Sequence, residues 1–82
     1  MQNQPKVYVG VKAQFMPDGR LLPLSVTWED GREFKVDQVT DVRKAASMKA
    51  GGTGVRYTVR IGAVYTYLFF EEDKWFVERR GA

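Results

Sequence analysis

Hydrophobic and polar residues alternate along most of the chain, which is the pattern of β-strands that bury one of their two faces. The first run covers residues 6–15, and its apolar positions are Val7, Val9, Val11, Ala13 and Phe15. A second run covers residues 22–28, and a third begins at Phe34 and Val36. The first half of the chain is therefore predicted to form three strands.

Turn sequences separate these runs. Pro17-Asp18-Gly19 follows the first run, where proline fixes its own φ and glycine accepts a positive φ. Asp30-Gly31 follows the second run, and this dipeptide favours a type I′ hairpin turn with positive φ at both residues. Two hairpins in series form a meander. Because Pro23 lies inside the second run and lacks an N–H donor, we expect it at a sheet edge or a bulge.

The pattern changes after residue 37. Apolar residues then recur at helical spacing, with Thr40 or Asp41 as N-cap and Gly51 as the stop signal. These positions are Val39, Val42, Ala45, Ala46 and Lys49. They predict one short helix between the third and fourth strands, followed by a glycine-rich connection over 51–54.

Alternation returns in residues 55–61, 64–70 and 75–78. The predicted fold is mainly β, with five or six antiparallel strands in a small curled sheet or a partly closed SH3-like or OB-like barrel. An open twisted sheet with the helix across one face is the alternative. At 82 residues the chain is a single domain over 1–82, with an ordered part from about 6 to 79.

Composition narrows the function classes. The chain has no cysteine and no histidine, which removes disulfides, the usual zinc ligands and the side chains that most often act in acid–base catalysis. We therefore expect no enzyme activity, no cofactor and no metal site. The longest apolar stretch, residues 67–70, is far too short to span a membrane, and the N-terminus does not resemble a signal peptide. A cytoplasmic protein is the expectation.

Positive charge is concentrated in the middle of the chain. Residues 42–70 contain five basic residues and no acidic one, whereas the whole chain has a net charge of +3. The candidate residues for a nucleic acid or another anion are Arg43, Lys44, Lys49, Arg56 and Arg60. The adjacent strand offers Tyr65, Tyr67 and Phe69 as candidates for an interface or for stacking on bases.

These residues are compatible with two classes of ligand. The sequence favours a non-catalytic binding module whose partner is another protein, including a second copy of the chain. The alternative is a single-stranded nucleic acid, RNA or DNA, held by the basic and aromatic residues. The two classes differ in their salt dependence, which is steep only for the nucleic acid.

Three segments carry a resemblance to other proteins: residues 23–37, 41–52 and 67–78. Together they resemble a family of small uncharacterised bacterial proteins of similar length, which are carried as hypothetical. The resemblance implies a bacterial cytoplasmic origin. It brings no catalytic or binding residues to this chain.

Overall fold

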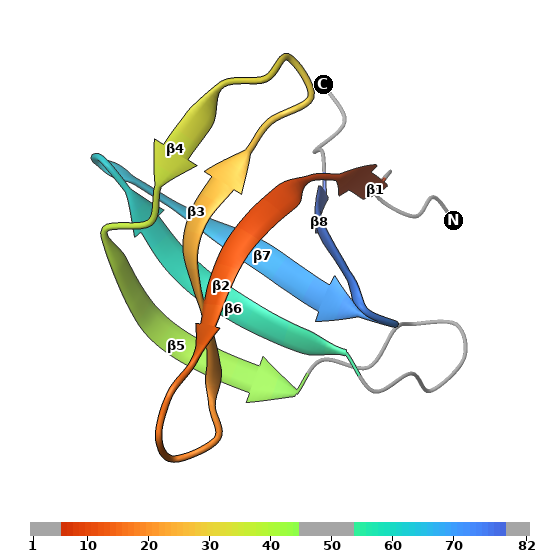
Figure 1. The fold of residues 1–82 in the computed structure, drawn as a ribbon. Helices are drawn as coiled ribbons and strands as arrows, with labels where there is room; N and C mark the ends of the chain where they lie inside the picture. Colours follow the sequence, from red (N-terminus) through yellow and green to blue (C-terminus); the bar gives the residue numbers. More distant parts are fainter. Residues whose placement is uncertain (1–5, 45–53, 79–82) are drawn as a thin grey trace, which may run out of the picture.

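The computed structural model describes residues 6–44 and 54–78, which form eight strands in two antiparallel sheets (Figure 1). The larger sheet has five strands in the order β1-β8-β7-β6-β5, and the smaller has three in the order β2-β3-β4. The strands are β1 (Lys6–Tyr8), β2 (Gly10–Phe15), β3 (Leu21–Thr27), β4 (Glu33–Lys35), β5 (Gln38–Lys44), β6 (Val55–Ile61), β7 (Val64–Glu71) and β8 (Lys74–Glu78). In these residues we find no helix that could span a membrane.

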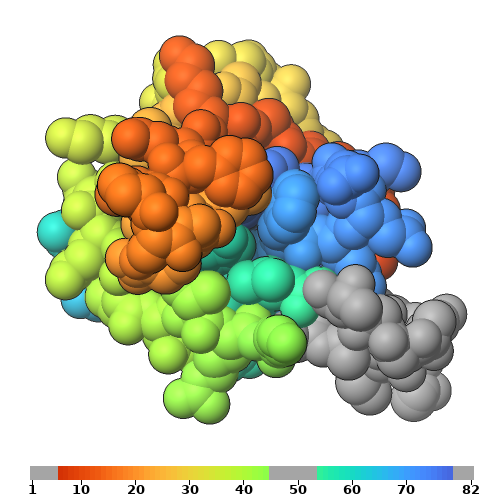
Figure 2. All heavy atoms as spheres, turned by 60° about the horizontal axis from the view of Figure 1, so that its bottom comes forward, coloured from red at the N-terminus to blue at the C-terminus, as the bar shows by residue number. Residues whose placement is uncertain are grey.

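The smaller sheet crosses one face of the larger sheet, and the core lies between them (Figure 1). Its buried residues are Val26, Val36, Tyr57, Val59 and Leu68. The Tyr57 hydroxyl donates a hydrogen bond to the Leu21 carbonyl, which ties β6 to β3. Figure 2 shows the tip of the β2–β3 hairpin (orange) lying against β5 (green). The mainly β prediction is confirmed. The described residues form eight strands rather than the predicted five or six, and the sheets do not close into a barrel. The single strand predicted over residues 6–15 is divided into β1 and β2, which belong to different sheets.

The predicted helix is wrong for residues 39–44, which belong to β5. Val39 pairs with Val59 and Val42 with Tyr57, and a bulge at Thr40 separates the two pairs. The extra residue of a bulge shifts the alternation, so two apolar residues three positions apart face the same side of the sheet. This spacing imitates a helix in the sequence. The rest of the predicted helix, residues 45–50, lies outside the described residues.

The predicted hairpins are confirmed, but the turn at Asp30-Gly31 is not type I′. Only Gly31 has a positive φ, of 91°, and Gly19 in the preceding hairpin has the same value. Trp28 N donates to the Arg32 carbonyl at 2.8 Å and Gly31 N to the Trp28 carbonyl at 2.9 Å, which makes a three-residue loop ending in glycine. Both hairpins share the sequence Asp-Gly-Arg, whose aspartate accepts hydrogen bonds from the backbone N and the Nε of the arginine.

Positive φ at two consecutive residues occurs instead at Glu72 and Asp73, with values of 54° and 63°. These residues connect β7 and β8 directly after the Glu71–Lys74 pair. Such a turn matches the right-handed twist of the strands, although non-glycine residues rarely adopt it. The expected bulge near Pro23 is also present, because the β2–β3 register shifts between Lys12 and Ala13, the partner of Pro23.

Candidate functional site

The larger sheet has one face that points away from the smaller sheet. Cα partners in neighbouring strands share a face, so the register can be followed across all five strands. One such row runs through Arg43, Arg56, Phe69, Phe76 and Tyr8. Because this row alternates with core residues along each strand, its side chains lie opposite the core. We call this side of the larger sheet the aromatic face.

Two further rows lie on the aromatic face. Asp41, Thr58 and Tyr67 form one, and Gln38, Arg60 and Tyr65 form the other. Tyr65 is 60% exposed, Tyr67 42% and Tyr8 54%, so three phenol rings of this face are open to solvent. A face with so many accessible rings has π surface available to a partner.

The rings on this face contact one another. The Phe69 and Phe76 rings stack with centroids 5.2 Å apart and an angle of 5° between their planes. Tyr8 meets Phe76 edge-on at 5.7 Å, and Tyr67 meets Phe69 edge-on at 6.4 Å. Phe76 is only 3% exposed as a result. The rings therefore form a continuous layer across β7, β8 and β1.

Basic side chains lie over this layer. The Arg56 guanidinium is 4.5 Å from the centroid of the Tyr67 ring, and Lys6 Nζ is 4.7 Å from that of Phe76. Lys74 Nζ lies 6.0 Å from the Tyr8 centroid. Cations over ring faces are stabilised by the ring quadrupole and remain available to an anion on their other side.

Acidic residues neutralise only part of this charge. Arg43 pairs with Asp41 at 2.8 Å, and Lys6 pairs with Glu71 at 3.7 Å. Among residues 6–44 and 54–78, no ion pair involves Arg56 or Arg60.

Arg56 and Arg60, which pair with no carboxylate in the described part of the chain, differ in their hydrogen bonds. Arg60 donates from one terminal nitrogen to the Gly62 carbonyl at 2.7 Å. The Nε of Arg56 is buried and has no hydrogen-bond partner within the described residues. No carboxylate of the described residues pairs with either guanidinium group on the aromatic face.

Six of the eight candidate residues lie together on this face: Arg43, Arg56, Arg60, Tyr65, Tyr67 and Phe69. Lys44 follows Arg43 directly in β5, so alternation places it on the opposite side of the sheet. Lys49 lies outside the described residues.

Sequence reasoning missed the other end of the aromatic face, which Lys6, Tyr8, Lys74 and Phe76 form. Each pair is two residues apart on its strand, and this spacing was visible in the sequence. The β7–β8 hairpin places Lys74 and Phe76 beside β7, and the pairing of β1 with β8, which joins the two ends of the chain, adds Lys6 and Tyr8 to the same face.

We compared the chain with protein-family models, curated protein sequences and solved structures. No match was found. The function therefore has to be inferred from the geometry and chemistry of the chain itself.

Proposed function

We propose that the aromatic face binds single-stranded nucleic acid. The observation that supports this most is the joint presence of exposed tyrosine rings and of two arginines, Arg56 and Arg60, that no described carboxylate neutralises. Nucleotide bases stack on aromatic rings, and their phosphates pair with guanidinium groups. Both groups of a nucleotide thus find a partner on one face.

Single strands fit this face better than a duplex. Stacking on Tyr65 or Tyr67 requires bases whose flat surfaces are free, which is the case only when they have left a helical stack. Every base has such a surface, so binding through rings and phosphates depends weakly on sequence. The proposal covers RNA and DNA alike.

Fluorescence anisotropy of labelled oligo-dT and oligo-U at several salt concentrations tests this proposal. The wild type should bind both, with an affinity that falls as salt rises. Replacing Arg56 and Arg60 by glutamine removes two phosphate contacts, so the slope of log affinity against log salt should decrease in magnitude by about 1.4. Tyr67→Ala should lower the affinity while leaving the slope nearly unchanged.

Arg20→Gln is the matched control. Arg20 lies in the β2–β3 hairpin, is exposed and pairs with Asp18, so this variant removes a charge away from the aromatic face. Its affinity and salt slope should stay close to those of the wild type. Absence of binding to either oligonucleotide, or equal losses in the control and in the double variant, would contradict the proposal.

The sequence ranked protein–protein association, including self-association, first. Self-association is therefore a second candidate, and the position of β5 favours it. β5 is the last strand of the larger sheet in the order given above, so it has a neighbour on one side only within the described residues. If two copies paired antiparallel about Val42, Asp41 of each would lie opposite Arg43 of the other. Such cross-strand pairs are stabilising, and Val42 is 44% exposed.

Asp41→Lys separates the two candidates. It places like charges opposite each other in a β5–β5 pair, so a dimer seen by analytical ultracentrifugation should dissociate. The same substitution adds positive charge to the aromatic face, so oligonucleotide affinity should stay equal or rise. A wild type that sediments as a monomer at high protein concentration would rule out the second candidate alone.

A further inference from the structure

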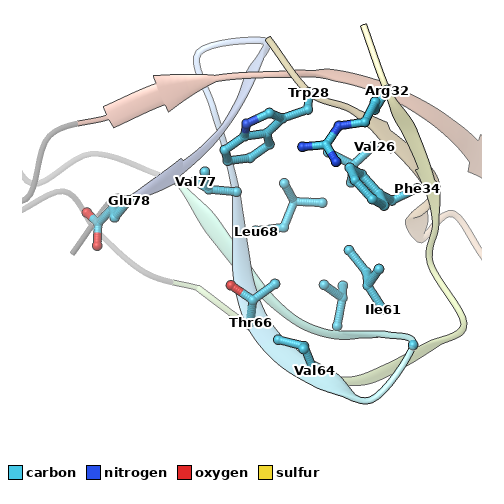
Figure 3. A pocket seen from close by; sticks show the side chains of 12 residues that line it. Val26, Trp28, Arg32, Phe34, Ile61, Val64, Thr66, Leu68, Val77 and Glu78 are labelled. Carbon is cyan, nitrogen blue, oxygen red and sulfur yellow. The ribbon is translucent and has the colours of Figure 1, made fainter. Parts of the chain in front are cut away.

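A cavity of about 640 Å³ lies between the two sheets (Figure 3). It is on the opposite side of β6 and β7 from the aromatic face, because Val59 and Leu68 of the core belong to its lining. Small-molecule sites in proteins commonly have volumes of about 300–1,000 Å³. The cavity is therefore large enough for a small ligand, and it is independent of the proposed nucleic-acid site.

Most of the lining is apolar. Val59 and Leu68 are 0% and 1% exposed and form the closed side, whereas Val64 at the β6–β7 end is 62% exposed. Trp28 and Phe34 add aromatic surface from the smaller sheet and its hairpin. An occupant that covers the accessible side chains among these, Trp28, Phe34 and Val64, would remove apolar surface from water, which is the main favourable term in such binding.

Arg32 supplies the positive charge at this cavity. Asp30 accepts its Nε–H at 2.7 Å and its backbone N–H at 3.0 Å, which holds the side chain on the Asp-Gly-Arg turn. In Figure 3 the two terminal nitrogens of Arg32 point toward the cavity beside Trp28 and Phe34. The guanidinium carbon is also 5.5 Å from the Phe34 centroid. The edge that faces the cavity has the geometry for a bidentate carboxylate.

The remaining charged residue of the lining does not oppose an anion at Arg32. Glu78 lies at the other end of the view in Figure 3, with its carboxylate turned away from the cavity. The apolar interior therefore favours an apolar group, and the guanidinium edge of Arg32 favours an anionic group in the same molecule.

We infer that this cavity binds a small amphipathic carboxylate. Its apolar tail lies between the sheets on Trp28, Ile61 and Val64, the accessible apolar side chains of the lining, and its carboxylate pairs with the terminal nitrogens of Arg32. Asp30 positions Arg32 for this contact and does not touch the ligand. This ligand class follows from the charge at the cavity together with the apolar character of its walls.

Decanoate below its micelle concentration is the probe, and decan-1-ol is its uncharged match. In a ¹⁵N NMR titration with decanoate, the indole N–H signal of Trp28 should shift, whereas that of Trp75, which lies outside this lining, should stay in place. Arg32→Gln should weaken decanoate binding by about tenfold or more, because a charge-assisted pair is lost. The affinity for decan-1-ol should be unchanged.

Arg20→Gln is again the matched control, because Arg20 sits on the same Asp-Gly-Arg turn in the other hairpin and is not part of the lining. It should bind decanoate like the wild type. The inference is wrong if decanoate leaves the Trp28 signal unshifted, or if Arg32→Gln weakens decanoate and decan-1-ol equally. It is also wrong if decanoate shifts mainly the signals of Tyr8, Tyr65 and Tyr67, which would indicate adsorption to the aromatic face.

Discussion

The two faces of the larger sheet carry different side chains and have different roles. The inner face is aliphatic at its centre, where Val59 and Leu68 are fully buried in the core. The other side carries rings and guanidinium groups, and Tyr65 and Tyr67 remain open to solvent. Inner positions stabilise the fold by burial, whereas exposed rings contribute little burial and are available to a ligand. Substitutions on the two faces should therefore affect different properties.

The largest effect is expected at Leu68. Replacing it by alanine leaves a cavity among the core residues, so the free energy of unfolding should fall by about 2–5 kcal/mol. Tyr65→Ala removes an exposed ring and should change the free energy of unfolding by less than about 0.5 kcal/mol. Urea unfolding followed by tryptophan fluorescence measures both. Equal losses for the two variants would remove the distinction between the faces.

The same tyrosine should matter for the ligand. If bases stack on Tyr65, its replacement by alanine weakens oligonucleotide binding by about 1–3 kcal/mol. Anisotropy titrations at one salt concentration measure this loss, with Phe15→Ala as the control. Phe15 is 72% exposed but lies on β2 of the smaller sheet, so its loss should leave the affinity unchanged.

A smaller effect is expected within the aromatic face itself. The guanidinium of Arg56 lies 4.5 Å from the Tyr67 ring, and such contacts at accessible sites contribute about 0.5–1 kcal/mol. A double-mutant cycle with Arg56→Gln and Tyr67→Leu should give a coupling energy of that size in urea unfolding. Arg20 lies in the β2–β3 turn and Tyr65 in β7 of the larger sheet, so this pair should show no coupling.

The smaller sheet has an outer face of its own, and there a titration effect is expected. The Ser25 hydroxyl donates to Glu33 at 2.8 Å and Lys12 Nζ lies 3.3 Å from the same carboxylate, and these contacts lower the pKa of Glu33. A lowered pKa in the folded state stabilises the fold above the ordinary glutamate pKa of about 4.3, and the contribution is lost as the pH falls through the folded value.

Glu33→Gln removes this contribution. Its unfolding midpoint should therefore lie below that of the wild type at neutral pH, and the difference should shrink in acid below about pH 4.3. Thermal unfolding over a pH series measures it. A difference that stays constant into strong acid would contradict the role of the Ser25 and Lys12 contacts.

The sequence predicted most of the strands and turns, but not how the strands pack together. Alternation and the two Asp-Gly turns predicted β2, β3, β4 and their hairpins, because these features depend on local chemistry. Alternation did not show that the run over residues 6–15 divides into β1 and β2 on different sheets. The helix was wrong because the bulge at Thr40 brings Val39 and Val42 to one side of β5. Local spacing does not distinguish such a bulge from a helical turn.

The residues of the candidate site also fall into those that the sequence predicted and those that it did not. Arg56 and Arg60 were expected on one face, since they are four residues apart on one strand, and Tyr67 lies beside them through the next hairpin. Lys6 and Tyr8 were missed because β1 meets β8 across the full length of the chain. Lys74 and Phe76 were also missed, although the local β7–β8 hairpin places them beside Phe69. The cavity at Arg32 depends on how two sheets cross, which alternation does not encode.

The central claim is that nucleic acid binds on the aromatic face. A ¹⁵N NMR titration with oligo-dT that observes the arginine Nε–H signals tests it directly. The signals of Arg56 and Arg60 should shift and saturate, whereas those of Arg20 and Arg32, on the two hairpin turns of the smaller sheet, should stay in place. Equal shifts of all four signals, or shifts confined to Arg20 and Arg32, would contradict the claim.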